Sequence, residues 1–304
     1  MGFELALDCK VVLAETPIWD SRLKKLYWTD LFEGAVHRYD PATGQDECAE
    51  TRGMIGAAIP CETPGRLLVA IDDGLMLLDF ATGKLEPVAA PQPNTGEFRY
   101  NDTRCDAVGR IFTSTVSKFL TEPHFDPDVM TGKFYMVDLD GAVVTLVDKL
   151  VQYNTILFDN RNENMYVIDT HNKKLLRFGY SLAKGAFGKP EVVISFDDMP
   201  DGASVDANDN LYVCHWSEKK HISVWSLKDY SFVKTIPFPV KHICCCGFAG
   251  DDMRDFYVAT SKFWLPEGDQ DFSTGAGGIF KTRFDVPSVQ EHFYKDQSVR
   301  KKAE

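Results

Sequence analysis

Residues 26–30 read Leu26-Tyr-Trp-Thr-Asp30, a short run of apolar and aromatic residues of the kind found in β-strands. A segment of the same shape returns five times along the 304-residue chain, at intervals of 41, 43, 55, 46 and 45 residues. The later copies are Leu67-Leu-Val-Ala-Ile71, Arg110-Ile-Phe-Thr-Ser114, Met165-Tyr-Val-Ile-Asp169, Leu211-Tyr-Val-Cys-His215 and Phe256-Tyr-Val-Ala-Thr260. A period of roughly 45 residues with several short strands per unit is typical of β-propeller blades.

A second strand-like segment follows each copy, for example Val36-His-Arg-Tyr-Asp40 and Leu75-Met-Leu-Leu-Asp79. Turns rich in Asp, Asn and Gly, such as Asp206-Ala-Asn-Asp-Asn210, precede most copies and favour tight hairpins, because these residues accept a positive φ readily. The pattern predicts an all-β fold, namely a six-bladed β-propeller with a central channel, built as a single domain over residues 1–304.

Three segments fall outside the repeat. The early strand-like segment at about residues 4–13 is expected to close the ring by completing the last blade. The longest interval contains residues 117–131, with Pro123 and Pro127, and predicts a loop over one face of the ring. The last residues, about 295–304, are expected to form a flexible C-terminal tail.

Charge and composition exclude several classes of partner. The chain has 45 acidic and 33 basic residues, a formal net charge of -12, and its basic residues occur only in short scattered runs, so we expect no nucleic-acid partner. No run approaches the roughly 18 apolar residues of a membrane span, so we expect no membrane partner. The eight cysteines lack the spacing of a disulfide framework, which favours a reduced, cytoplasmic compartment. Cys244, Cys245 and Cys246 alternate across one strand, so one or two should be small core residues.

The inner strands of a propeller line its channel, and here they should begin about 10 to 13 residues before each aromatic strand. Three of these positions carry oxygen donors: Glu15, Asn154 and Asp201. Because they start inner strands of three different blades, they should converge at one end of the channel. Two carboxylates and one amide carry a charge of -2, which balances one divalent cation, and this donor set favours Ca²⁺, Mg²⁺ or Mn²⁺ over Zn²⁺. Taken singly, each residue has an ordinary alternative as a turn, cap or edge residue.

Arg99 and Asn101 fall two residues apart on the third inner strand, so they share one face of it. Facing away from the channel, the arginine would be buried without an evident carboxylate partner, which is costly. Facing the channel, the guanidinium and the amide offer several hydrogen-bond donors to a polyhydroxylated ring. We therefore expect both side chains to point into the channel.

At these residues the sequence resembles the gluconolactonase / regucalcin (senescence marker protein) / luciferin-regenerating enzyme family, and the resemblance runs along nearly the whole chain. The stretches that carry it are Ala14-Glu-Thr-Pro-Ile-Trp19, Arg99-Tyr-Asn-Asp102 with Asp106-Ala-Val-Gly-Arg110, Asn154-Thr-Ile156, Pro200-Asp-Gly-Ala-Ser-Val-Asp206 and Gly277-Gly-Ile-Phe280. They are similar to the family's Gly-Glu-Gly-Pro-x-Trp, Arg-Phe-Asn-Asp-Gly, Asn-Gly-Leu and Pro-Asp-Gly blocks and to its closing strand. No single stretch is decisive, but their order and spacing together are specific.

The resemblance implies a six-bladed propeller with one divalent metal ion in the channel, Ca²⁺ in first place with Mg²⁺, Mn²⁺ or Zn²⁺ left open. The implied site residues are the metal ligands Glu15, Asn154 and Asp201, of which Asp201 is also catalytic, and the substrate contacts Arg99, Asn101 and Glu122. Four residues stand where the family has glycine, and each adds a side chain near the channel mouth: Ala14, Thr16, Thr103 and Thr155. Two of them, Ala14 and Thr16, flank the first ligand, Glu15.

The resulting expectation is a metal-dependent lactonase that hydrolyses a sugar or sugar-acid lactone. The ion would polarise the carbonyl and stabilise the oxyanion, while Asp201 assists the attacking water. Two alternatives stay open: a hydrolase of organophosphates or activated esters on the same scaffold, and a non-enzymatic calcium-binding regulatory protein. The expected partner is a small-molecule lactone, and the sequence leaves the oligomeric state open.

Overall fold

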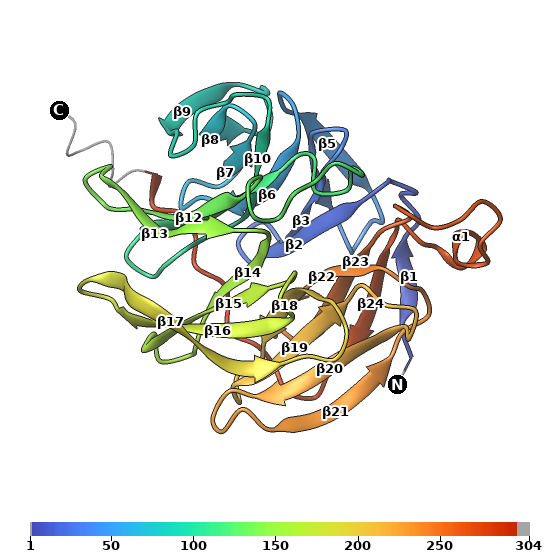
Figure 1. The fold of residues 1–304 in the computed structure, drawn as a ribbon. Coiled ribbons are helices and arrows are strands. Elements are labelled where there is room, and N and C mark those ends of the chain that lie inside the picture. Colours follow the sequence, from blue (N-terminus) through green and yellow to red (C-terminus); the bar gives the residue numbers. More distant parts are fainter. Residues whose placement is uncertain (1, 297–304) are drawn as a thin grey trace.

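The computed structural model describes residues 2–296, in which six four-stranded antiparallel sheets form a ring (Figure 1). The first three blades consist of β2 (Ala14–Asp20), β3 (Lys25–Asp30), β4 (Ala35–Tyr39) and β5 (Asp46–Glu50); β6 (Ile55–Pro60), β7 (Arg66–Ile71), β8 (Gly74–Asp79) and β9 (Leu85–Ala89); and β10 (Phe98–Cys105), β11 (Ile111–Ser117), β12 (Gly132–Val137) and β13 (Val143–Leu150). The other three consist of β14 (Tyr153–Phe158), β15 (Asn164–Asp169), β16 (Lys174–Ser181) and β17 (Gly185–Ser195); β18 (Pro200–Val205), β19 (Asn210–His215), β20 (His221–Ser226) and β21 (Phe232–Pro237); and β22 (Ile243–Ala249), β23 (Asp255–Thr260), β24 (Ile279–Arg283) and β1 (Glu4–Leu7).

The prediction of a six-bladed β-propeller is confirmed. The aromatic segments that revealed the repeat are the second strands β3, β7, β11, β15, β19 and β23. These strands are buried at nearly every position, because blades pack against both of their faces. The outer strands β13 and β21 are mostly exposed, and they carry polar residues such as Lys149 and Lys234.

The ring is closed by strands from opposite ends of the chain. Strand β1 pairs antiparallel with β24, with Glu4 opposite Lys281 and Leu5 opposite Phe280. Farther along, Leu13 makes an isolated bridge to Ser261 in the same blade. Each inner strand also contacts the inner strands of both neighbouring blades. The last blade therefore joins early and late parts of the sequence in one sheet (Figure 1).

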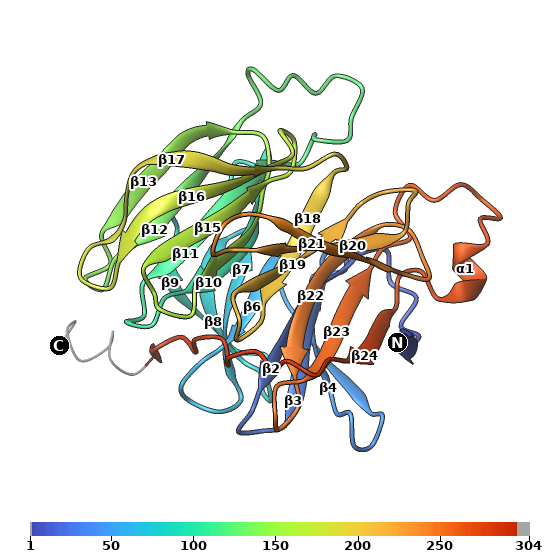
Figure 2. The same ribbon diagram turned by 90° about the horizontal axis from the view of Figure 1, so that it is seen from below.

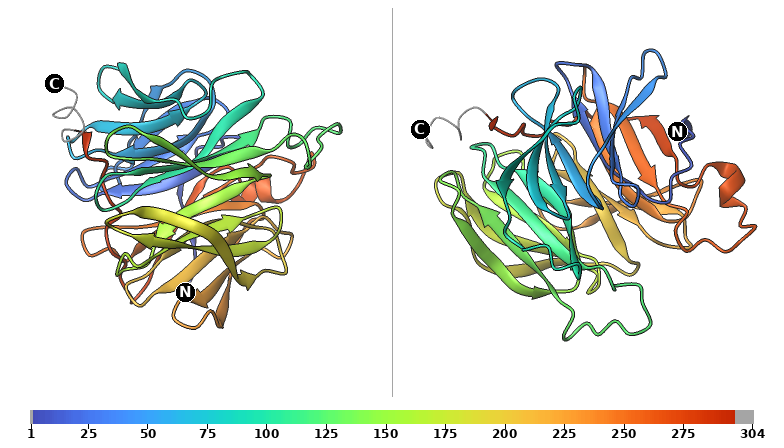
Figure 3. Two further views of the ribbon diagram at one scale, coloured as in Figure 1. Left: turned by 60° about the vertical axis from the view of Figure 1, so that its left-hand side comes forward. Right: turned by 90° about the horizontal axis from the view of Figure 1, so that it is seen from above.

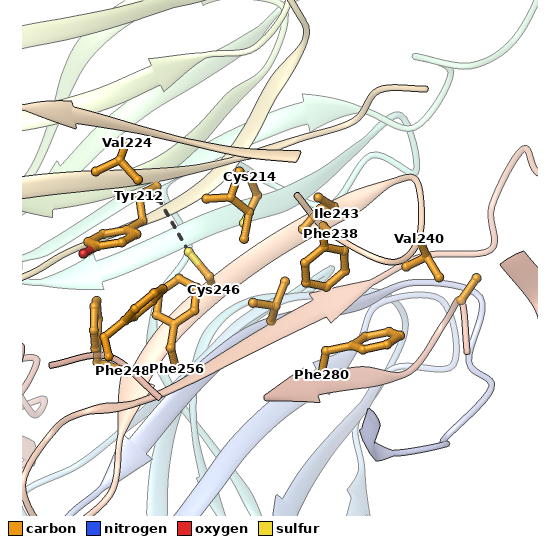
Figure 4. Close-up of a cluster of buried hydrophobic side chains, with 14 residues drawn as sticks. Tyr212, Cys214, Val224, Phe238, Val240, Ile243, Cys246, Phe248, Phe256 and Phe280 are labelled. Atoms are coloured by element: carbon orange, nitrogen blue, oxygen red, sulfur yellow. Dashed lines mark hydrogen bonds between the residues drawn. The ribbon is translucent and has the colours of Figure 1, made fainter. Parts of the chain in front are cut away.

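The core lies between neighbouring blades. Figure 4 shows the cluster between the fifth and sixth blades, where Tyr212 packs among Phe248 and Phe256, with ring centroids 5.5 and 5.4 Å away. The thiol of Cys246 lies in this cluster and donates to the carbonyl oxygen of Tyr212 at 3.6 Å. All three consecutive cysteines are buried, more than the one or two expected, because β22 is covered on both faces. All eight cysteines are unpaired.

The C-terminal segment after β24 crosses one end of the ring (Figure 2). Its hydrogen bonds and ion pairs reach every blade, with partners Trp19, Pro60, Arg104, Asn162, Ala207 and Met253. Within the segment expected to be a flexible tail, Asp296 is buried and accepts a hydrogen bond from the Thr63 backbone N–H at 3.1 Å. The rest of that expected tail, residues 297–304, lies outside the described residues.

Two long connections leave the ring. The loop was predicted at residues 117–131; Ser117 is the last residue of β11, and residues 118–131 join β11 to β12 and project away from the blades (Figures 2 and 3). The segment between β23 and β24 contains α1 (Asp271–Thr274), a single helical turn. No helix in residues 2–296 is long and apolar enough to cross a membrane.

Candidate active site

Four of the six inner strands begin with a polar side chain at the same end of the ring, opposite the C-terminal segment. Glu15 comes from β2, Arg99 and Asn101 from β10, Asn154 from β14 and Asp201 from β18. All five side chains line one cavity of about 270 Å³. They are called the polar floor below. The convergence expected from the repeat offset is therefore present, and Arg99 and Asn101 both face the cavity.

Irregular backbone aims these side chains. The register between the first and second strands shifts beside Glu15, Asn154 and Asp201. The residue after Glu15 is Thr16, with φ 53°, and the residue after Asn154 is Thr155, with φ 51°. A β-branched residue in this left-handed region is strained, so both threonines keep a backbone conformation that glycine adopts most easily.

Hydrogen bonds hold Thr155 in this conformation. Its backbone N–H donates to the carboxylate of Asp102, and its hydroxyl oxygen accepts from the Ala203 N–H at 2.6 Å. These bonds tie the fourth blade to the third and the fifth. The threonine hydroxyl therefore adds a link between blades that glycine could not make, while Asn154 beside it lines the cavity.

The floor brings two buried carboxyl groups, those of Glu15 and Asp201, close together. Oxygens of Glu15 and Asp201 and the sulfur of Cys244 all lie within 4.8 Å of one another. Burial raises the pKa of Glu15 well above its usual range, and the charges of Asp201 and Asp102 raise it further, against Arg99. Burial and Asp102 likewise raise the pKa of Asp201. Among the described residues, no side-chain donor bonds to either carboxylate, and this arrangement suits a bound cation.

A chain of hydrogen bonds positions the side-chain amide of Asn154. The Nδ2 of Asn154 donates to Thr170 Oγ1 at 2.8 Å, which leaves its Oδ1 facing the cavity side. That oxygen accepts from Asn101 Nδ2 at 2.5 Å, while Arg99 Nη1 donates to Asn101 Oδ1 at 2.6 Å. A carbonyl oxygen has two lone pairs, so Asn154 Oδ1 keeps one for an ion. Asn101 thus orients Asn154 as well as lining the cavity.

The sixth expected residue is not brought to the floor. Glu122 is exposed on the loop between β11 and β12 and does not line the cavity. The same loop does reach the cavity through Lys118, Leu120 and Thr121. Lys118 is held there by an ion pair with Asp72, Nζ to Oδ2 at 2.8 Å.

Two features of the site escaped the sequence analysis. One is the position of Cys244: it is a buried core residue, as expected, and does not line the cavity, but its sulfur lies within 4.8 Å of oxygens of Glu15 and Asp201. The other is a set of aromatic side chains from loops and turns that line the outer part of the cavity: Phe32, Trp216, Phe263 and Trp264. This set is called the aromatic rim below. Its members follow the ends of second strands, a position that a repeat search does not select.

The fold and the sequence have known counterparts. A family model described as "SMP-30/Gluconolactonase/LRE-like region" matches residues 13–262. The chain belongs to this family. The resemblance inferred from the sequence is therefore confirmed, and the five floor residues all lie inside the matched region of the SMP-30/gluconolactonase/LRE-like chain.

Individual family members resemble the chain over almost its whole length. A candidate sugar lactone lactonase, YvrE of Bacillus subtilis, is 27% identical over 295 residues, covering 95% of this chain and 97% of its own. The pentonolactonase XacC of Haloferax volcanii is 26% identical, covering 93% and 94%. The solved calcium-binding protein regucalcin of Agrobacterium tumefaciens superimposes with a TM-score of 0.86 at 24% identity, covering 97% of each chain, which supports the fold.

Proposed function

We propose that the protein is a divalent-metal-dependent lactonase that hydrolyses a cyclic ester of the sugar-lactone type. The observation that carries the proposal is the polar floor, in which two carboxylates that accept no side-chain hydrogen bond within residues 2–296 and one oriented amide oxygen line the same cavity as Arg99. Relatives named as a sugar lactone lactonase and a pentonolactonase support the substrate class.

The residues that would hold the ion are Glu15, Asn154 and Asp201. They supply only oxygens with a total charge of -2, which suits Ca²⁺ first and Mg²⁺ or Mn²⁺ next. A bound ion would polarise the lactone carbonyl as a Lewis acid. Cys244 adds a sulfur within 4.8 Å of both carboxylates, a ligand type that would favour Zn²⁺.

The remaining chemistry falls to the side chains. Asp201 would accept the proton of the water that attacks the carbonyl carbon. The ring C–O bond then breaks, and the ring oxygen takes up a proton to give the hydroxy acid. Arg99 would donate to hydroxyl or ring oxygens of the substrate, since its guanidinium faces the cavity with donors beyond the one bonded to Asn101.

The test is a panel of aldonolactones, with D-glucono-1,5-lactone first, assayed on purified protein before and after chelation and after adding back each ion. We expect hydrolysis that chelator abolishes and Ca²⁺ restores. An aryl phosphotriester and a phenyl ester in the same panel test the hydrolase alternative. Calorimetric Ca²⁺ binding without turnover of any substrate would contradict the lactonase and favour the regulatory alternative.

A further inference from the structure

The aromatic rim forms a continuous wall. The ring centroids of Phe32 and Phe263 lie 5.2 Å apart, and those of Phe263 and Trp264 lie 5.0 Å apart with planes only 24° from parallel. Trp264 meets Trp216 edge to face at 6.0 Å. Three blades contribute these side chains, and all four line the cavity above the polar floor.

Trp264 stands out within this wall. Its side chain is 55% exposed, and its backbone has a φ of 64°. An exposed tryptophan gains little from packing, and a bulky aromatic residue in the left-handed region is a strained outlier. Strain of this kind concentrates at ligand sites, where surrounding structure holds it in place.

The residues just before Trp264 are hydrogen-bonded to two other segments of the chain. The Lys262 N–H and the Ser261 hydroxyl donate to the carbonyl oxygen of Val12 at 3.1 and 2.8 Å. His242 Nδ1 lies 2.9 Å from the Phe263 carbonyl oxygen, and its ring stacks on Trp216 at 4.5 Å. The rim is therefore set in place before a ligand arrives, which lowers the entropy lost on binding.

The same cavity thus has two chemically distinct parts. The floor offers charges, amides and a guanidinium to an oxygen-rich ring, whereas the rim offers four aromatic faces and edges, with Met54 and Met199 beside them. A small polyhydroxylated lactone on the floor would leave the rim in contact with water. Thioether and aromatic groups together favour flat apolar ligands.

We propose that the preferred substrate carries an apolar, aryl-type group next to its lactone ring, and that the aromatic rim binds this group. The proposal rests on the lactonase function for the chemistry of the ring. It adds a requirement to the substrate class: the preferred lactone carries a flat apolar substituent. Trp264 then acts as a specificity residue.

The test compares three lactones: γ-phenyl-γ-butyrolactone, unsubstituted γ-butyrolactone and D-glucono-1,5-lactone. In the wild-type protein with Ca²⁺ we expect kcat/KM for the phenyl lactone to exceed that for the unsubstituted one by at least about tenfold, the yield of burying one aryl face. Trp264→Gly should lower the ratio of kcat/KM between the phenyl and the unsubstituted lactone by about that factor. Glycine adopts a φ of 64° without strain, so this variant should melt no lower than wild type.

The matched control is Phe272→Ala. Phe272 is also an exposed aromatic side chain, 41% exposed, in the same connection between β23 and β24, but it does not line the cavity. This variant should keep the wild-type ratio between the lactones.

The outcomes separate the two proposals. Equal kcat/KM for phenyl and unsubstituted lactones, or a Trp264→Gly variant that loses both equally, overturns the role of the rim while the lactonase stands. Absence of turnover with every lactone overturns the lactonase. In that event calorimetry of phenyl-lactone binding tests the role of the rim. Binding to the wild-type protein that Trp264→Gly weakens would support that role, and no binding to the wild-type protein would overturn it.

Discussion

The floor of the cavity comes from the starts of inner strands, whereas its rim comes from loops that follow the second strands. Glu15, Asn154 and Asp201 occupy equivalent positions in three blades, so the floor is a property of the repeat. Trp264 and Phe263 belong to the long connection between β23 and β24, whereas the corresponding connections of most other blades are short. If the proposals above hold, the ion and the lactone ring are bound by residues that the repeat places, whereas a substituent on the ring meets residues from individual loops.

The largest effect should come from the floor. Asp201→Asn removes one of two carboxylates from the proposed ion site together with the proposed base, so hydrolysis of every lactone should fall by at least about a thousandfold. Steady-state kinetics at saturating Ca²⁺ measures this, and circular dichroism should be unchanged. Asp197→Asn, at an exposed acid four residues earlier, is the control and should keep full activity. Wild-type turnover in Asp201→Asn would remove this residue from the mechanism.

Arg99→Ala should split the substrates rather than abolish activity. Without the guanidinium, KM for D-glucono-1,5-lactone should rise 10- to 100-fold, about 1.4–2.8 kcal/mol, and KM for lactones without hydroxyls should rise much less. Because Arg99 faces Glu15 and Asp201, its loss should leave Ca²⁺ binding at least as tight. Equal losses on both kinds of lactone, or weaker Ca²⁺ binding, would assign Arg99 to the fold or the ion site.

The melting temperature should depend on pH partly through His242, whose imidazole stacks on Trp216 of the rim. Burial lowers the pKa of His242, so the neutral ring is favoured in the folded protein. Its contribution to stability is complete above the unfolded pKa of about 6.5 and is lost as pH falls through the lower folded value. The melting temperature should therefore drop less between pH 7 and pH 5 in His242→Asn, since asparagine also accepts the φ of 52°. An identical drop in both proteins would contradict this.

Cys244→Ser should have the smallest effect. If only oxygens hold the ion, Ca²⁺ affinity measured by calorimetry should change less than about twofold, because serine keeps the size of the side chain without the sulfur. The same variant should bind Zn²⁺ more weakly, since sulfur favours that ion. A large loss of Ca²⁺ affinity would mean that residue 244 supports the floor in a way that neither the charges nor the ligands explain.

The fold and most of the floor were predictable because both follow the period. Once Leu26–Asp30 and its five copies define the blades, the offset to Glu15, Asn154 and Asp201 needs only the geometry of inner strands. Cys244 is likewise the second residue of an inner strand, but a cysteine in an apolar run is indistinguishable by sequence from a core residue. The rim was not predictable, because no local pattern tells that Trp216 and Trp264 meet across two blades.

Glu122 illustrates the limit of alignment by family. Its loop has no repeat counterpart, so nothing in the chain fixes its register against relatives, and in the structure its neighbour Thr121 lines the cavity instead. The glycine replacements went the other way. Thr16 and Thr155 suggested a changed pocket, yet both adopt a positive φ of the kind that glycine adopts most easily, and Glu15 and Asn154 beside them still line the cavity.

The C-terminal segment that touches all six blades has a consequence for biosynthesis. The ribosome makes the first blade long before residues 285–296, and before the β24 partner of β1. Neither the closing sheet nor the C-terminal segment across the ring can form until residues 279–296 have left the ribosome. Until then β1 lacks its partner β24, and both of its strand edges are unpaired. Such edges are prone to pairing with other chains, so synthesis at high concentration should favour aggregation before closure rather than after it.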